Sequence, residues 1–222
     1  MVKKITSIVL AAGKGTRMNS SLSKPLHSVA GKPMLSHIID NIKEAKLNDI
    51  IVVINKDNED IQNYLEINYP EVRTSIQDEQ NGTGGAVKSV FENYDLSDSD
   101  GIVVIFGDTP LLKIKSIEKL SNSLDQDDLT IMAFDTENPY GYGRIILKDN
   151  KLNSIVEEFN VTDENKNIKL CNGGVMALKN QNLVNYLGLL KNNNPKKELI
   201  LSDMVEIIND HHGSSNFIKC EE

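Results

Sequence analysis

The chain has 222 residues, of which 39% are apolar and 25% charged, and this suits one large α/β domain with a substantial core. Its formal net charge of −8 disfavours nucleic acid and anionic membranes as partners. Cys171 and Cys220 form neither a disulfide framework nor a metal site. Since no apolar run reaches the about 18 residues of a membrane span and no signal-peptide cleavage site follows the first one, we expect a cytoplasmic protein.

In the first half of the chain, apolar runs rich in β-branched residues alternate with amphipathic segments. This pattern predicts strands over 5–12, 49–55, 72–77 and 102–106, and helices over 33–45, 57–68, 84–94 and 114–124. Pro33 is placed as the first residue of its helix, because proline suits that position. Such alternation is typical of right-handed βαβ units on a mostly parallel sheet.

After Leu129 the pattern loosens. It predicts strands over 131–134, 144–147, 152–157 and 174–178, then helices over 182–190 and 202–211. We find no low-complexity linker and no internal repeat, so the sequence predicts one domain over residues 1–222 with a mixed sheet in its second half.

A phosphate-binding loop is predicted near the N-terminus. The first 39 residues hold six basic side chains and no acidic one, and inside them a buried strand stops at Gly13. Gly13 and Gly15 allow close approach of the backbone, while Arg17 and Lys24 carry charges that can grip a triphosphate. The alternative is an ordinary glycine turn with solvated lysines, which the absence of acids disfavours.

Two better-known phosphate loops do not fit this segment. No Gly-Lys-Ser/Thr stands four residues after the first glycine, as a Walker A loop requires. A dinucleotide fingerprint needs glycine or alanine where Met18 stands, which disfavours an NAD(P)-dependent oxidoreductase.

Four further residues are candidates for binding. Gln77 carries the donors and acceptors that read a pyrimidine edge, or it is a plain polar loop residue. Gly82 and Gly84 suit close backbone approach at the positive N-terminus of a helix, or form a simple turn. Asp108 follows a buried strand where open α/β sheets bind ligands, and a lone carboxylate there suits Mg²⁺ shared with phosphates. Its alternative role is that of a turn carboxylate before Pro110.

Five ordered motifs closely resemble those of the sugar-1-phosphate nucleotidyltransferases. They are Leu-Ala-Ala-Gly-x-Gly-Thr-Arg-Met at 10–18 with Lys-Pro at 24–25, Gln-x-x-Gln-x-Gly-Thr-Gly at 77–84, Gly-Asp-x-Pro-Leu at 107–111, Tyr-Gly-Arg at 142–144 with Ile-Val-Glu at 155–157, and Asn-Gly-Gly at 172–174. The resemblance runs from about residue 5 to 203. Within the family it is greatest to the uridylyltransferase domains of bifunctional bacterial enzymes that act on N-acetylglucosamine 1-phosphate.

The resemblance implies a Rossmann-like, three-layer α/β fold with a mixed, mostly parallel sheet, whose nucleotide-binding half is about 1–110 and sugar-binding half about 111–222. It implies an enzyme that transfers a uridylyl group from UTP to a sugar 1-phosphate, N-acetylglucosamine 1-phosphate first, with Mg²⁺ as cofactor. The implied catalytic residues are Arg17, Lys24 and Asp108, the last also the metal ligand. The implied nucleotide-binding residues are Leu10, Ala11, Ala12, Gly13, Gly15, Thr16, Gln77, Gly82 and Thr83. The implied sugar-binding residues are Phe106, Gly107, Gly143, Glu157 and Asn172.

Departures from the family pattern gather on the sugar and metal side. Phe159 and Asn160 stand where the family usually has Lys-Asp, Phe106 replaces a common Tyr, and Ile-Leu-Ser-Asp at 200–203 replaces Tyr-x-Thr-Asp. In the family, the second metal ligand is an Asn in a segment just beyond the position of Glu222, and an acyltransferase region follows downstream. Neither is part of this sequence. Three alternatives follow: a piece of a longer enzyme, a standalone transferase for another sugar 1-phosphate, or a non-catalytic protein that binds nucleotide sugars.

Overall fold

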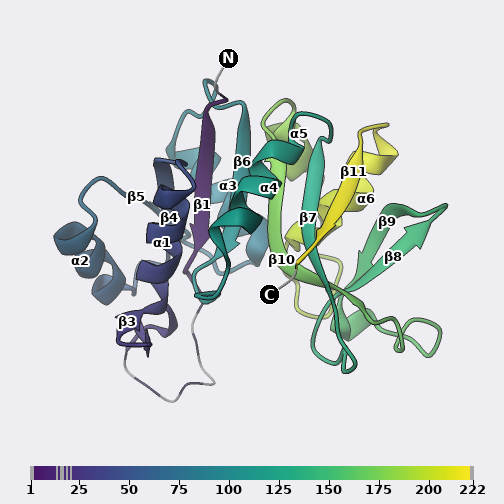
Figure 1. The fold of residues 1–222 in the computed structure, drawn as a ribbon, viewed down its shortest axis with the longest axis horizontal. Helices are drawn as coiled ribbons and strands as arrows, with labels where there is room; N and C mark the ends of the chain where they lie inside the picture. The colour runs from purple at the N-terminus through teal and green to yellow at the C-terminus, as the bar shows by residue number, and fades with distance from the viewer. Residues whose placement is uncertain (1–2, 14, 16–17, 19, 21, 221–222) are drawn as a thin grey trace.

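One nine-stranded sheet runs through the part of the chain that the computed structural model describes, which is residues 3–13, 15, 18, 20 and 22–220 (Figure 1). Seven strands lie in the order β11 (Ser215–Lys219), β7 (Leu129–Asp135), β10 (Leu170–Lys179), β6 (Gly101–Phe106), β1 (Ile5–Leu10), β4 (Asp49–Ile54) and β5 (Arg73–Ile76). Neighbours from β6 to β5 are parallel, as are β7 and β11, whereas β10 is antiparallel to β6 and β7. The antiparallel pair β8 (Arg144–Lys148) and β9 (Lys151–Val156) extends from β10.

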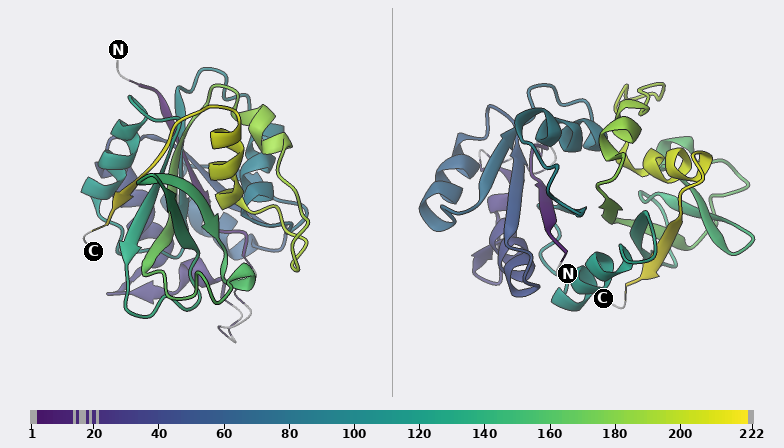
Figure 2. Two further views of the ribbon diagram at one scale, coloured as in Figure 1. Left: turned by 90° about the vertical axis from the view of Figure 1, so that its right-hand side faces the viewer. Right: turned by 90° about the horizontal axis from the view of Figure 1, so that it is seen from above.

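Helices cover both faces of this sheet, which gives the expected three layers (Figure 2). On one face, β1 and β4 pack against α1 (Met34–Glu44), α2 (Glu59–Asn68) and α4 (Ile114–Ser123). On the other face lie α3 (Thr83–Asn93), α5 (Leu183–Gly188) and α6 (Met204–Asp210). Because β1 is buried on both faces, its apolar residues follow one another from Ile8 to Leu10 without alternation, and the polar Thr6 and Ser7 are buried as well. No helix in the described ranges is both long and apolar enough to cross a membrane.

Several element boundaries differ from the predicted ones. The first strand ends at Leu10, although Ala11 and Ala12 stay buried. Helix α1 starts one residue after Pro33, because Pro33 belongs to a short hairpin of β2 (Ser28–Val29) and β3 (Lys32–Pro33). Three 3₁₀ turns were not predicted; they are η2 (Lys24–Leu26), η3 (Glu158–Asn160) and η4 (Leu201–Asp203).

Strand β10 begins four residues earlier than predicted. Its pairing with β7 shifts register between Asn172 and Met176, and Gly174 there has a φ of +79°. Three residues of β10, 173–175, lie opposite the single residue Met132 of β7, and such a bulge re-aims the side chains around it. The glycines that interrupted the apolar pattern are therefore part of the strand.

Candidate functional site

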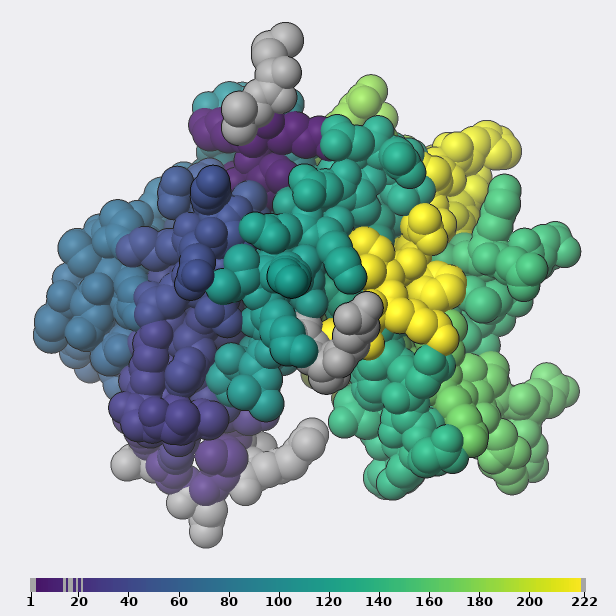
Figure 3. Space-filling model, viewed as in Figure 1, coloured from purple at the N-terminus to yellow at the C-terminus, as the bar shows by residue number. Residues whose placement is uncertain are grey.

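A cavity of about 600 Å³ opens at the C-terminal edge of the parallel strands. This edge carries the loops that follow β1, β5 and β6, as expected for a ligand site in an open α/β sheet. Figure 3 shows the molecule hollowed on its lower side, between the first half of the chain and the second. A larger hollow, of about 800 Å³, is lined by the end of α3, the loop before β6 and the end of β10, and contains none of the predicted site residues.

The loop after β1 forms one wall of the cavity. All its described members that the sequence predicted to bind nucleotide line the cavity, namely Leu10, Ala11, Ala12, Gly13 and Gly15. Thr16 and Arg17 lie outside the described residues.

Two amides that were not predicted as site residues hold this loop in place. The carbonyl of Ala12 accepts hydrogen bonds from Asn55 Nδ2 at 3.0 Å and from Gln80 Nε2 at 2.7 Å. A Cβ at Gly13 would meet no heavy atom within 4 Å, so its open side faces free space. At Gly15, where φ is +56°, a Cβ would lie 3.1 Å from the Cβ of Lys24, so glycine is needed there for both reasons. The backbone of this wall is therefore fixed and closely approachable.

Lys24 and Asp108 meet on the cavity wall. Lys24 Nζ donates to Asp108 Oδ2 at 2.5 Å, and the two side chains are 42% and 31% exposed. Asp108 lies in the turn that follows β6, where the Thr109 hydroxyl donates to the Phe106 carbonyl at 2.8 Å. The structure thus brings together two residues that lie 84 positions apart in the sequence, one cationic and one anionic.

Gly107 has a packing role in the same turn. Its N–H donates to the Leu10 carbonyl at 2.8 Å, and a Cβ on Gly107 would lie only 3.0 Å from that oxygen. Glycine therefore lets the loops after β1 and β6 come together beneath Asp108.

Gln77 lies on the opposite wall and is 5% exposed. Its amide nitrogen donates to Asn81 Oδ1 at 3.0 Å and to the Gly82 carbonyl at 3.1 Å. Both N–H donors are then in use, and among the described residues the side-chain oxygen is left to accept from a ligand. Gly82 and Thr83 also line this wall, at the N-terminus of α3.

The glycines before α3 approach the protein's own backbone. A Cβ on Gly82 would lie 2.5 Å from the Leu199 carbonyl oxygen, and one on Gly84 would lie 3.0 Å from the same atom. The sequence explained these glycines by close approach to a ligand; the structure adds close packing of residues 198–199, and Glu198 lines the cavity as a result.

The predicted sugar-binding residues form a second cluster. The Asn172 N–H donates to the Gly143 carbonyl at 2.8 Å, and a Cβ on Gly143 would lie 3.4 Å from Glu157 Oε1. Phe106 connects this cluster to the cavity, since it lines the cavity and its ring packs against Gly174, two residues from Asn172.

Next to this cluster, Asp203 is a carboxyl group that sequence reasoning did not select. Burial is the main cause that raises its pKa to about 6, and the nearby charges of Glu206 and then Glu157 add to the effect. Asp203 stood at the end of the segment 200–203 that was compared with Tyr-x-Thr-Asp, and Gln80 stood within the Gln-x-x-Gln segment, whereas Glu198 stood in no motif.

Asp108 was predicted to bind Mg²⁺. Within the described ranges, no group of three or more His, Cys, Asp and Glu residues is arranged to hold a metal ion. A single half-exposed carboxylate on a cavity wall still fits Mg²⁺, which usually takes one or two protein carboxylates and keeps waters or phosphate oxygens for its other positions.

The sheet with helices on both faces defines a protein of the Rossmann-like, three-layer α/β class. A family model described as the MobA-like NTP transferase domain matches residues 7–166, and the chain belongs to that family. The bifunctional protein GlmU of Brucella anthropi is 40% identical over 202 residues, which are 90% of this chain and 44% of that protein. The bifunctional protein GlmU of Sinorhizobium fredii is 34% identical over 227 residues, or 100% of this chain and 49% of that protein. The chain spans about half the length of the curated relatives it matches.

Solved structures confirm the predicted fold class. A putative glucose-1-phosphate thymidylyltransferase from Bacillus anthracis, in complex with a sucrose, superposes with a TM-score of 0.78 at 20% identity, over 98% of this chain and 87% of that one. HddC from Yersinia pseudotuberculosis, complexed with GMP-PN, superposes with a TM-score of 0.70 at 22% identity, over 97% and 90%. The resemblance read from the sequence motifs is confirmed at the level of family and fold.

Proposed function

We propose that this protein transfers a uridylyl group from UTP to a sugar 1-phosphate, N-acetylglucosamine 1-phosphate first, and releases pyrophosphate. The observation that carries the proposal is the Lys24–Asp108 pair on the wall of a cavity that also contains the glycine loop after β1. A cation and a carboxylate at that place suit a triphosphate and the metal ion that accompanies it. The similarity to the GlmU proteins supports the choice of reaction.

Gln77 supports uracil as the base. Because its amide donors are already bonded to Asn81 and Gly82, its oxygen can only accept, so the base must offer a donor. Uracil offers N3–H, and so does thymine, so UTP and dTTP are the nucleotides to compare first.

The proposed reaction is an attack of the phosphate oxygen of the sugar 1-phosphate on the α-phosphorus of UTP, with pyrophosphate as the leaving group. It requires orientation of two anions and neutralisation of their charge more than covalent help from the protein. Lys24, together with Arg17 by its place in the motif, would neutralise the phosphates. Asp108 would hold Mg²⁺, which supplies further charge neutralisation when bound.

In this proposal, residues 1–110 hold the nucleotide and residues 111–222 hold the sugar. Glu157 can accept hydrogen bonds from sugar hydroxyls, and the Asn172 amide can donate to an acetamido carbonyl. Gly143, in the loop before β8, has no side chain and so leaves room beside Glu157 and Asn172.

The test is pyrophosphate release with UTP, Mg²⁺ and a panel of sugar 1-phosphates. Release with N-acetylglucosamine 1-phosphate above glucose 1-phosphate is the expected result. Release with a different sugar would change the acceptor and keep the reaction, whereas UTP binding without any release would refute the reaction and favour a nucleotide-sugar-binding protein.

A further inference from the structure

Glu157 is held by a serine from a distant part of the chain. Ser202 Oγ donates to Glu157 Oε1 at 2.6 Å, and Ser202 is 5% exposed. A short hydrogen bond to a carboxylate is stronger than one between neutral groups. Because Oε1 already accepts from Ser202, among the described residues Oε2 is left as the atom that can accept from a ligand, and the missing Cβ at Gly143 leaves room beside the carboxylate.

The surroundings of Glu157 make this donor important. Asp203 lies close enough to Glu157 for the charge of Glu157 to contribute to the raised pKa of Asp203. Repulsion from an ionised Asp203 would turn the Glu157 carboxylate away if it had no donor. The Ser202 hydroxyl opposes that rotation directly.

The turn that carries Ser202 is also attached to the nucleotide side. Turn η4 contacts both α3 and β9, and the Leu201 N–H donates to Thr83 Oγ1 at 3.0 Å. Two backbone hydrogen bonds continue the attachment: Gly84 N–H to the Leu199 carbonyl at 2.8 Å, and Leu199 N–H to the Asn81 carbonyl at 2.6 Å. Ser202 is therefore held in register with the helix N-terminus that lines the nucleotide cavity.

A second contact fixes residues 194–203, the bridging segment, to the loop after Glu157. The Lys196 ammonium lies 5.2 Å from the centre of the Phe159 ring, within the range of a cation–π interaction. Asn194 closes the segment on itself, donating to the Glu198 carbonyl at 2.6 Å. The bridging segment thus contacts both predicted subsites.

We infer that Ser202 is a positioning residue that sets the Glu157 carboxylate for a hydroxyl of the acceptor sugar, in register with the nucleotide held at Thr83. The inference rests on the proposed function for the identity of the acceptor, and on the observed hydrogen bonds for the geometry. Loss of the Ser202 hydroxyl frees Glu157 and weakens sugar binding, while the nucleotide contacts remain in place.

The test compares Ser202→Ala, Ser202→Thr and the control Ser121→Ala in steady-state assays with UTP, N-acetylglucosamine 1-phosphate and Mg²⁺. Ser121 is a matched control because it is also buried and hydrogen-bonded, but within α4, to the Glu118 carbonyl. We expect Ser202→Ala to raise the KM for the sugar phosphate about tenfold and leave the KM for UTP unchanged. Ser202→Thr keeps the hydroxyl and should restore the wild-type KM.

A double-mutant cycle with Glu157→Gln separates positioning from general damage. If Ser202 acts through Glu157, then Ser202→Ala adds little to the effect of Glu157→Gln, because the two residues act as a unit. Equal sugar-phosphate KM values for wild type and Ser202→Ala, or fully additive effects in the cycle, would overturn the inference.

Calorimetric binding of UDP and of UDP-N-acetylglucosamine keeps this test separate from the reaction. The inference predicts that Ser202→Ala weakens binding of the nucleotide sugar about tenfold and leaves UDP binding unchanged. A wild type that releases no pyrophosphate but shows this difference would refute the proposed reaction and support the role of Ser202. If wild type and Ser202→Ala bind UDP-N-acetylglucosamine with the same affinity, the role of Ser202 is overturned, whether or not the protein is active.

Discussion

At the scale of single residues, Lys24 is the described cation with the clearest place in the site. Its ammonium group lies 2.5 Å from Asp108 on the cavity wall and remains 42% exposed, so a phosphate or metal ion can reach the pair. We expect Lys24→Ala to lower the rate of pyrophosphate release by about 100-fold, because a fixed charge that stabilises the transferring phosphates is lost. Rapid-mix assays with UTP and N-acetylglucosamine 1-phosphate measure the rate.

A lysine at the far edge provides the control for Lys24. Lys179 pairs with Asp128 at 2.9 Å at the end of β10, so Lys179→Ala also removes a cation from an ion pair. It should leave turnover unchanged. Near-normal turnover in Lys24→Ala would contradict the assignment of the site.

Asp203 gives a prediction about stability and pH. Its pKa is raised to about 6, mainly by burial, so the folded protein holds this proton more tightly than the unfolded chain. The stabilising contribution is complete below the unfolded pKa near 4 and is lost as the pH rises through about 6. We expect Asp203→Asn to raise the free energy of unfolding at pH 7.5 by about 1 to 2 kcal/mol, with solvent screening taken into account, and to give no gain at pH 4.

Urea unfolding between pH 4 and pH 8 measures this difference. Asp163→Asn is the control, since the Asp163 side chain is 94% exposed and pairs only with Lys166 at 2.8 Å. A gain for Asp203→Asn that stays constant with pH would show that a cause other than ionisation is responsible.

At the scale of secondary-structure elements, the packing of the bridging segment on α3 depends on Gly82. Its φ is +102°, and a Cβ would lie 2.5 Å from the Leu199 carbonyl oxygen, which is backbone and cannot turn aside. We expect Gly82→Ala to lower the free energy of unfolding by about 2 to 4 kcal/mol, through strain and displacement of the segment. It should also raise the KM for both substrates, because the segment contacts both subsites.

The control for Gly82 is a glycine with free space around it. A Cβ on Gly188, the last residue of α5, would meet no heavy atom within 4 Å, and alanine favours a helix. Gly188→Ala should leave stability equal or slightly higher in the same urea titration. A Gly82→Ala protein as stable as wild type would mean that Leu199 can move away from α3 at little cost.

Across the whole molecule, the sequence predicted those elements whose burial is uniform. Strands β1, β4 and β6 are buried on both faces, and each contains an unbroken apolar run, over 8–10, 50–54 and 102–106. The start of β10 was missed, because Asn172 and two glycines interrupt its pattern at a bulge whose geometry depends on Phe106 and β7.

In the site, too, the sequence predicted the residues that stand in local motifs and missed those placed by contacts between distant segments. Local motifs predicted the residues of the cavity wall from Leu10 to Gly15 and at Gln77, Gly82 and Asp108, and the structure brings them together. Ser202 and Glu198 were not predicted as site residues, because their place depends on contacts such as Leu201 with Thr83, which are 118 residues apart. A single sequence carries no local signal for such a contact.

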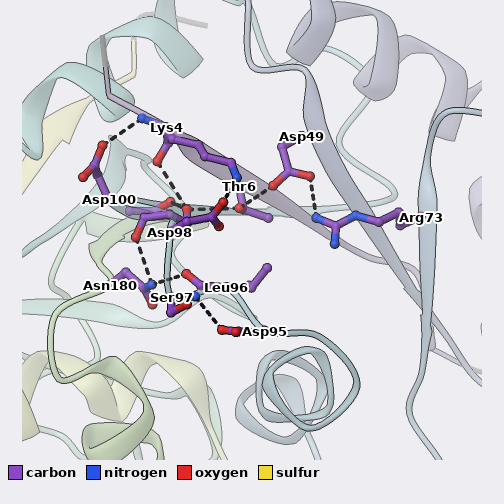
Figure 4. A network of polar contacts seen from close by, with 12 residues as sticks. Lys4, Thr6, Asp49, Arg73, Asp95, Leu96, Ser97, Asp98, Asp100 and Asn180 are labelled. Atoms are coloured by element: carbon purple, nitrogen blue, oxygen red, sulfur yellow. Dashed lines mark hydrogen bonds and ion pairs between the residues drawn. The ribbon is translucent and has the colours of Figure 1, made fainter. Parts of the chain in front are cut away.

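The edge of the sheet opposite the cavity holds a polar network that should affect stability without affecting binding (Figure 4). Asp49 accepts from the fully buried Thr6 hydroxyl at 2.7 Å and from Arg73 Nη2 at 2.5 Å, which ties β1, β4 and β5 together at their N-terminal ends. Asp49→Ala would leave both donors without this acceptor, and we expect a loss of about 2 to 3 kcal/mol in the free energy of unfolding. Urea denaturation measures the loss, and the KM for UTP should not change.

An exposed ion pair in the same region tests whether burial is the reason for the expected loss of stability in Asp49→Ala. Asp98 pairs with Lys4 at a side-chain exposure of 69%, so Asp98→Ala should leave the free energy of unfolding unchanged. If Asp49→Ala also raised the KM for UTP, the N-terminal end of β1 would be coupled through the strand to the loop at Gly13. An unchanged KM would instead mean that the rigid sheet separates the two edges, one serving stability and the other binding.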